Sequence, residues 1–192
     1  NGEKIMSFEE DILVEFKSNA ETAIESLRID LKKLRTGRAN ISLLDGVRID
    51  YYGSSTPLSQ CANLSVPDAR TINIKPWDKG IIVEIEKAIT RAGLGLNPQN
   101  DGEMIRLPIP SLTEDRRKDL VKQSKARGED AKVSIRNARR DANEMLKVAE
   151  KDKEISEDEL KRALENVQEI TQTQSNCVDA VLTSKEEEIL EI

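Results

Sequence analysis

The residues best suited to chemistry in this chain are three closely spaced arginines. The stretch SIRNARRDAN, residues 134–143, places Arg136, Arg139 and Arg140 within five residues of one another. With Lys132 they fall at positions i, i+4, i+7 and i+8, which lie on one face of a helix. Like charges crowded on one helix face repel each other. That repulsion has to be offset by neighbouring carboxylates or by an anionic partner.

A second basic series comes earlier in the chain. Arg28, Lys32 and Arg35 step by four and three residues, as on one face of a helix. If the two helices pack together, the two series come to lie side by side. Arginine is suited to bidentate phosphate contact, and no aromatic residue stands between these positions to stack on bases. The pattern therefore favours folded RNA that is recognised through its phosphates and its shape.

The charge of the chain is segregated, which leaves two alternatives to RNA binding open. The net charge is −6 over 192 residues, yet 113–140 contains ten basic and five acidic residues, and 141–192 contains six and fifteen. One alternative is that the arginines pair with carboxylates of the acidic segment, in exposed ion pairs worth about 0–1 kcal/mol each. The second is an anionic partner that is not RNA.

Catalysis has little support in the sequence. The chain contains no histidine, the commonest general base and metal ligand, and no P-loop or GxSxG motif. Cys61 and Cys177 lie far apart, without the spacing of a zinc site or a disulfide framework. No apolar run approaches the roughly 18–20 residues of a membrane span. We therefore expect no enzyme activity, metal, cofactor or membrane insertion, but a cytoplasmic monomer.

Three long helices are predicted from apolar residues that recur every three or four positions. The first covers about 5–35 and stops before Gly37. The second begins after Thr113 and runs to about Lys151, and the third begins at a capping box formed by Ser156 and Glu159. The positions predicted to face the bundle core are Ala131, Ile135, Ala138, Ala142, Met145 and Ala149 in the second helix, and Leu160, Leu164, Val167, Thr171, Gln174, Val178 and Val181 in the third.

The middle of the chain has a different pattern. Residues 46–53, GVRIDYYG, alternate apolar and polar positions as in a β-strand that ends at a turn. The segments ANLSV, TINIKPW and MIRLPIP predict further strands, with a break at PDAR. Residues 78–93 predict a helix with Asp78 as its N-cap and Gly93 just past its end.

These elements predict an α+β protein with two domains. The first helix has no partner of its length except the last two, so residues 1–37 and 112–192 are expected to form a discontinuous three-helix bundle. Residues 38–111 form the inserted α/β domain. Two connections join the domains, which is the arrangement of a hinge. The residues assigned to this joint are Gly37, Arg38 and Ala39 in one connection and Leu107, Pro108, Ile109, Pro110, Ser111 and Leu112 in the other.

Several long motifs resemble one known family. LRTGRAN, SLLDG, YYG, GLNP, SLTEDRRKDL, RNARRDAN and KDKEISEDEL follow in this order and closely resemble the bacterial ribosome recycling factors, over nearly the whole chain from about Met6. The resemblance implies an L-shaped molecule, similar in outline to tRNA, with a β/α/β domain at a flexible joint. It also implies a role in translation. Such factors act with elongation factor G and GTP on the 70S ribosome left after termination, separate its subunits, and hydrolyse nothing themselves.

The resemblance also assigns roles to residues. The RNxRRD motif, which here carries Arg136, Arg139 and Arg140, is implied to face large-subunit rRNA, and the RTGRA motif from Arg35 to Ala39 is implied to mark the joint. The smaller domain is implied to meet elongation factor G. A competing hypothesis from another class is an interaction protein, similar to a coiled coil, that binds proteins through its acidic helix and is indifferent to RNA.

Overall fold

The computed structural model describes residues 7–191 and divides into two compact units. One consists of the segments that end at Leu34 and begin at Asp115, and the other is Arg35–Glu114. The first is helical and the second contains all six strands of the described chain, so the α+β class is confirmed. The inserted domain was expected to span 38–111, so the second unit is three residues longer than expected at each end.

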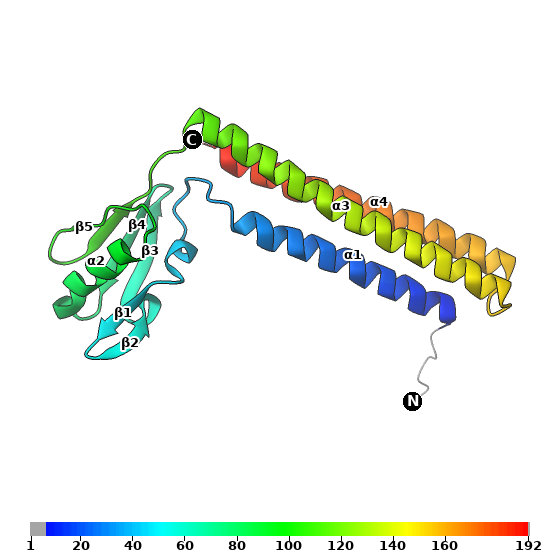
Figure 1. Ribbon diagram of the computed structural model, residues 1–192, viewed down its shortest axis with the longest axis horizontal. Helices are drawn as coiled ribbons and strands as arrows, with labels where there is room; N and C mark the ends of the chain where they lie inside the picture. Colours follow the sequence, from blue (N-terminus) through cyan, green and yellow to red (C-terminus); the bar gives the residue numbers. More distant parts are fainter. Residues whose placement is uncertain (1–6, 192) are drawn as a thin grey trace. The chain divides into compact units, whose positions relative to one another are not determined.

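The helical unit is a bundle of three helices that run side by side (Figure 1). They are α1 (Phe8–Lys32), α3 (Glu114–Lys151) and α4 (Glu157–Leu190). The 38 residues of α3 correspond to a rod of about 57 Å. The first helix ends three residues before the predicted Arg35, and its predicted start near Ile5 lies outside the described residues. No helix within residues 7–191 is long and apolar enough to span a bilayer.

Capping interactions fix the ends of these helices. Ser156 and Glu159 form the predicted capping box at the start of α4, and Ser7 and Glu10 form another at the start of α1. The end of α3 adopts a Schellman motif, in which the Glu154 N–H donates to the Ala149 carbonyl at 2.9 Å. Lys153 takes the left-handed conformation that this motif requires, with φ +61°.

The bundle core consists of two clusters along its length. One includes Ile12, Phe16, Ala142, Leu146, Ala149 and Val167, and the other includes Ala20, Ile24, Leu27, Leu31, Ala131, Ile135 and Val178. Met145, predicted to face the core, is 42% exposed, and Leu146 is buried in its place. That prediction was wrong because the step from Ala142 to the next core position is four residues, which a fixed alternation of four and three does not reproduce. Leu160, Leu164 and Val181 are only partly buried.

The second unit is a small α/β fold built on two antiparallel sheets. A hairpin joins β1 (Arg48–Tyr51) to β2 (Ser54–Pro57). The other sheet has the order β3-β4-β6-β5, formed by β3 (Ala62–Asp68), β4 (Thr71–Pro76), β5 (Gln99–Asn100) and β6 (Ile105–Pro108), and α2 (Ile82–Arg91) is the single α-helix of this unit. Short 3₁₀ turns occupy Ile41–Leu44, Leu58–Gln60 and Lys79–Ile81.

The core of this unit is formed by branched aliphatic side chains. Ile72, Ile74, Ile85, Ile105 and Leu107 are fully buried in it. The predicted strand in 46–53, the helix after Asp78 and the strand ended by prolines are present. The hairpin strand β2 and the short β5 were not predicted, because Ser54–Pro57 and Gln99–Asn100 have no buried alternate positions that produce a period of two.

Candidate functional site

The three arginines of the SIRNARRDAN stretch lie together on the outer surface of α3. They line an open depression of about 580 Å³, and we call its lining the basic face: Arg136, Asn137, Arg139, Arg140, Asn143, Glu144, Lys147, Val148 and Lys151. Five of these side chains are basic and one is a carboxylate. The basic face is therefore strongly positive within a protein whose net charge is −6.

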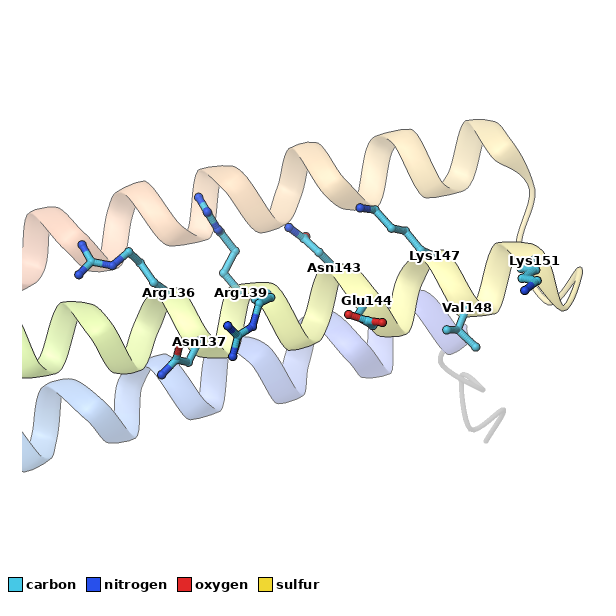
Figure 2. Close-up of a pocket in the computed structure, with 9 residues that line it drawn as sticks. Arg136, Asn137, Arg139, Asn143, Glu144, Lys147, Val148 and Lys151 are labelled. Atoms are coloured by element: carbon cyan, nitrogen blue, oxygen red, sulfur yellow. The ribbon is translucent and has the colours of Figure 1, made fainter.

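The helix geometry of α3 explains why these residues meet. At about 100° per residue, Arg136, Arg140 and Lys147 lie within about 40° of one another around the helix axis. The core of the bundle occupies the opposite side of α3, through Ala131 and Ile135. Figure 2 shows Arg139, Asn143 and Lys147 directed toward α4, and Asn137 toward the side of α1.

The carboxylates of α4 neutralise only one end of the basic series. Lys132 Nζ lies 2.6 Å from Asp179, and Lys125 Nζ lies 3.7 Å from Glu186. Further along α3, Arg139 faces the neutral amide of Gln168, to which its Nη1 donates at 3.3 Å. Pairing with an α4 carboxylate is therefore found at Lys132, which the intrachain-pairing alternative did not include, and not at Arg139.

The remaining arginines are also left available. Arg136 forms an ion pair with Glu129 of the same helix at 2.7 Å, but both side chains are more than half exposed, and such pairs contribute little. Arg140 is exposed and makes no ion pair or hydrogen bond to the described residues. An i+4 row drifts by about 40° per step around a helix, which carries Arg140 away from α4 while Lys132 stays beside it.

Two buried polar atoms at the basic face have no partner in the described part of the chain. They are Nε of Arg139 and Oδ1 of Asn143. A buried donor without an acceptor is unfavourable by about 1–3 kcal/mol, so groups of this kind are commonly found where a ligand or water supplies the missing bond.

The second basic series does not join this depression. Arg28 and Lys32 are exposed on α1, and Arg28 lies 3.8 Å from Glu25 of the same helix. Arg35 belongs to the other unit, where its Nη1 donates to the carbonyl of Leu94 at 3.0 Å. Lys132 does not line the depression either. Of the seven basic residues predicted, three therefore meet at one site.

Sequence reasoning missed four polar or basic members of the basic face. They are Asn137, Asn143, Lys147 and Lys151. Lys147 and Lys151 follow Arg140 by seven and eleven residues, so the same helix periodicity that groups the arginines includes them. The signal was present in the sequence, and extending the series by a few turns finds it.

The residues assigned to the joint lie against the sheet of the second unit. The Ala39 N–H donates to the Ala69 carbonyl and the Ile109 N–H to the Arg70 carbonyl, each at 2.7 Å. The Arg70 guanidinium also donates to Ser111 Oγ. Both connections are thus fastened to one turn, Ala69–Arg70, between β3 and β4.

Gly37 and Leu112 bring the two connections into contact. Gly37 has φ +72°, and a Cβ added there would lie 2.8 Å from Leu112 Cγ. On the second connection, Leu107 and Pro108 belong to β6, and Ile109 is buried in the core of the unit. Arg38 is exposed, and Pro110 follows Ile109 without secondary structure.

The described residues contain no cluster of three or more histidine, cysteine, aspartate or glutamate side chains able to hold a metal ion. Cys61 is buried and burial raises the pKa of its thiol, which disfavours the nucleophilic thiolate at neutral pH. The basic face is therefore the site that the geometry supports, and it is suited to binding an extended polyanion.

The geometry defines the class of an α+β protein in which a three-helix bundle with a basic face carries an inserted α/β unit, and the comparisons with known proteins identify the family. The family model for ribosome recycling factor matches residues 27–190. The chain belongs to this family. It is 53% identical over 182 residues to the ribosome-recycling factor of Myxococcus xanthus (strain DK1622), covering 95% of this chain and 98% of that protein.

Further relatives and solved structures agree. The ribosome-recycling factor of Sorangium cellulosum (strain So ce56) is 52% identical over 183 residues, covering 95% of this chain and 99% of that protein. The solution structure of a ribosome recycling factor superimposes with a TM-score of 0.73 at 39% identity, over 98% of this chain and all of that one. A second solved structure contains a T. thermophilus ribosome recycling factor and E. coli elongation factor G bound to the E. coli post-termination complex. Its recycling factor superimposes with a TM-score of 0.62 at 42% identity, over 96% of this chain and all of that one.

Proposed function

We propose that this chain recycles ribosomes: with elongation factor G and GTP, it separates the post-termination 70S ribosome into subunits, and it performs no covalent chemistry itself. The basic face on α3 is the observation that carries this proposal. Its arginines are not neutralised by α4, so they are available for the phosphates of large-subunit rRNA. Membership of the family supports it, as does the relative bound with elongation factor G to a post-termination complex.

The decisive experiment is a sucrose-gradient assay of post-termination ribosomes. We expect conversion to free subunits only when this protein, elongation factor G and GTP are all present. Conversion without the protein, or none with all three components at saturating concentrations, would contradict the proposal. Since its target is the bacterial ribosome, we propose that the protein acts in the cytoplasm, and that it does so as a monomer.

The role of the basic face is tested by Arg139→Ala. A charge-assisted hydrogen bond contributes about 1.5–3 kcal/mol, so we expect the affinity for the large subunit to fall roughly 10- to 100-fold. The slope of log affinity against log salt should decrease by about one. The melting temperature should change little, because Arg139 lies outside the core clusters of the bundle.

Arg127→Ala is the matched control. Arg127 is on the same helix, nine residues before Arg136, and therefore on the opposite side of α3, where it lies 3.7 Å from Asp30 of α1. The two variants lose the same charge from the same helix. Equal losses of affinity would show that the basic face has no special role.

Gln168→Glu tests the reasoning in the reverse direction. It places a carboxylate against Nη1 of Arg139, where Gln168 now accepts at 3.3 Å. We expect the added intrachain ion pair to compete with rRNA phosphate, so that affinity for the large subunit falls while the bundle is stabilised by about 0–1 kcal/mol. An unchanged affinity would mean that Arg139 does not contact phosphate.

We further propose that the two units move relative to each other about their connections during recycling. The hydrogen bonds of Ala39 and Ile109 to the Ala69–Arg70 turn, and the burial of Leu107, support a pivot on the bundle side of these residues, near Arg35–Gly37 and Leu112–Glu114. A cross-link engineered across the connections should abolish recycling but leave ribosome binding intact. Full activity of the cross-linked protein would refute the hinge.

A further inference from the structure

Glu144 is the one carboxylate in the lining of the basic face, and the proposed binding of rRNA phosphates does not explain it. Its side chain is exposed. A carboxylate repels phosphate, so at this position it weakens the attraction that the five basic residues of the face provide. A surface that bound only the RNA backbone would be expected to carry a neutral or basic residue here. Glu144 therefore needs a separate explanation.

Pairing with neighbouring basic residues does not supply that explanation. Arg140 lies four residues before Glu144 and Lys147 three residues after it, which are spacings that allow ion pairs on a helix. Within residues 7–191, however, the Glu144 carboxylate forms no ion pair and accepts no hydrogen bond. A basic residue that precedes an acidic one by four positions is also the less favourable order on a helix. The carboxylate of Glu144 is thus available to a ligand.

Asn137, Glu144 and Val148 form a row of their own on α3. At about 100° per residue they lie within about 40° of one another around the helix axis, and Figure 2 shows them along the edge of α3 away from Arg139 and Lys147. The row presents an amide, a carboxylate and an aliphatic side chain that is 50% exposed, and it contains no cation. These groups are the ones that contact nucleobases, whereas cations contact phosphates.

A carboxylate selects one kind of nucleobase edge. It only accepts hydrogen bonds, so it binds N–H groups and not carbonyl oxygens. Guanine presents two adjacent donors on its Watson–Crick edge, N1–H and the N2 amino group, and these match the two oxygens of the Glu144 carboxylate. In an RNA duplex that edge is paired, so it is available to a protein only in loops, bulges and ends. Val148, about one turn further along α3, offers the nucleobase an apolar contact.

We propose that Glu144 recognises an unpaired guanine of the large-subunit rRNA. Its carboxylate accepts hydrogen bonds from N1–H and from the N2 amino group, and Val148 packs against the nucleobase. This rests on the proposed function, in which the arginines of the basic face bind rRNA phosphates. The basic residues provide affinity for RNA in general, and Glu144 provides the preference for one site within it.

The first test compares Glu144→Gln with Asp141→Asn. Asp141 is an exposed carboxylate of the same helix that does not line the depression and forms no ion pair with the described residues. If charge alone mattered, both variants would bind RNA more tightly, because each loses one negative charge. We expect Asp141→Asn to bind the large subunit at least as tightly as the unsubstituted protein. Glu144→Gln should bind it about 5- to 150-fold more weakly, the loss typical of a bidentate contact to a nucleobase.

Poly(U), which contains no guanine, separates recognition from charge. Both variants should bind poly(U) at least as tightly as the unsubstituted protein in filter-binding assays at the same salt concentration. The melting temperatures of both variants should match that of the unsubstituted protein, because neither carboxylate forms an ion pair within the described part of the chain. A loss of affinity confined to the large subunit is then a loss of recognition.

The second test detects the nucleobase directly. Kethoxal modifies N1 and N2 of unpaired guanines, so a guanine whose Watson–Crick edge is held by Glu144 is protected. Large subunits are treated with kethoxal at saturating concentrations of each protein, and the modified guanines are located by primer extension. We expect at least one guanine to be protected by the unsubstituted protein and by Asp141→Asn, and to react again when Glu144→Gln is bound.

Several results would overturn the proposal. If Glu144→Gln binds the large subunit as tightly as the unsubstituted protein, or if Asp141→Asn weakens that binding equally, Glu144 reads no nucleobase. If every protected guanine stays protected with Glu144→Gln, another residue covers it. If the unsubstituted protein binds the large subunit but protects no guanine, this proposal fails while the proposed function stands. If it does not bind the large subunit at all, both fail.

Discussion

Gly128 lies where α3 and α4 approach closely. We predict that Gly128→Ala destabilises the bundle when Leu182 is present and stabilises it when Leu182 is replaced by alanine. An alanine Cβ built at Gly128 would lie 2.3, 2.8 and 2.9 Å from Cδ1, Cδ2 and Cγ of Leu182 on α4. All three contacts belong to one side chain. Gly128→Ala therefore sets two opposing contributions against each other, helix propensity and overpacking against Leu182.

The magnitudes can be compared directly. Replacing glycine by alanine inside a helix is favourable by about 0.8–1 kcal/mol, whereas forcing a methyl group into a packed contact is unfavourable by about 1–3 kcal/mol. The net expectation for Gly128→Ala is a destabilisation of about 0–2 kcal/mol. In a Leu182→Ala background the three clashing atoms are gone, so the same substitution should stabilise by up to about 1 kcal/mol. The coupling energy between the two sites is then about 2 kcal/mol.

Urea unfolding of the unsubstituted protein, the two single variants Gly128→Ala and Leu182→Ala, and the double variant measures this coupling energy. Circular dichroism at 222 nm reports mainly the bundle, since α1, α3 and α4 contain 25, 38 and 34 residues against 10 in α2. Trp77, the only tryptophan, lies in the other unit, and its fluorescence transition serves as an internal control that should not shift. If Gly128→Ala changes the free energy of unfolding by the same amount and in the same direction in the presence of Leu182 and in the Leu182→Ala variant, the contact with Leu182 does not determine its effect.

Three further predictions concern single groups. Lys153→Gly should stabilise the bundle by about 0.5–1 kcal/mol in urea, because Lys153 holds φ +61° at the end of α3. The hydrogen bond from the Ser156 N–H lowers the pKa of Glu159 below its ordinary value of 4.5. The stabilisation that Glu159 confers relative to Glu159→Gln should therefore be complete above about pH 4.5 and disappear as the pH falls through the lowered pKa. Thermal unfolding of both proteins at several pH values measures this difference. Cys177 should react with Ellman's reagent faster than Cys61, which is buried and has a raised pKa.

Helix periodicity made most of the bundle predictable from the sequence. Apolar residues at three- and four-residue steps place α1, α3 and α4 within a few residues of their observed bounds, and the capping box at Ser156 locates the start of α4. Helix termini and buried stripes depend on local sequence, so such patterns are informative. Met145 was wrongly predicted to face the core because the spacing of core positions along a helix depends on the helices that pack against it. Leu146 takes that place, in the cluster that includes Phe16 and Val167.

The smaller unit and the site were less accessible to sequence reasoning, because they depend on contacts between distant residues. The strand β2 has no apolar alternation, and its place is fixed by pairing with β1. Asp179 of α4 neutralises Lys132, whereas no α4 carboxylate pairs with Arg139. This difference depends on the register between the two helices. The fastening of Ala39 and Ile109 to one turn likewise joins residues seventy positions apart.

The register of α4 against α3 explains how an acidic protein keeps a basic surface. Asp179 and Glu186 lie opposite the lysines toward the start of α3, and they neutralise Lys132 and Lys125. Gln168 stands where a carboxylate would neutralise Arg139. Because exposed charges beyond a Debye length of about 8 Å are screened in the cell, the basic face attracts phosphate at close range, whereas the net charge of −6 opposes indiscriminate binding to RNA. If the basic face binds rRNA as proposed, Gln168→Glu, which places a carboxylate against Arg139, should weaken that binding more than an equal change of charge elsewhere on α4.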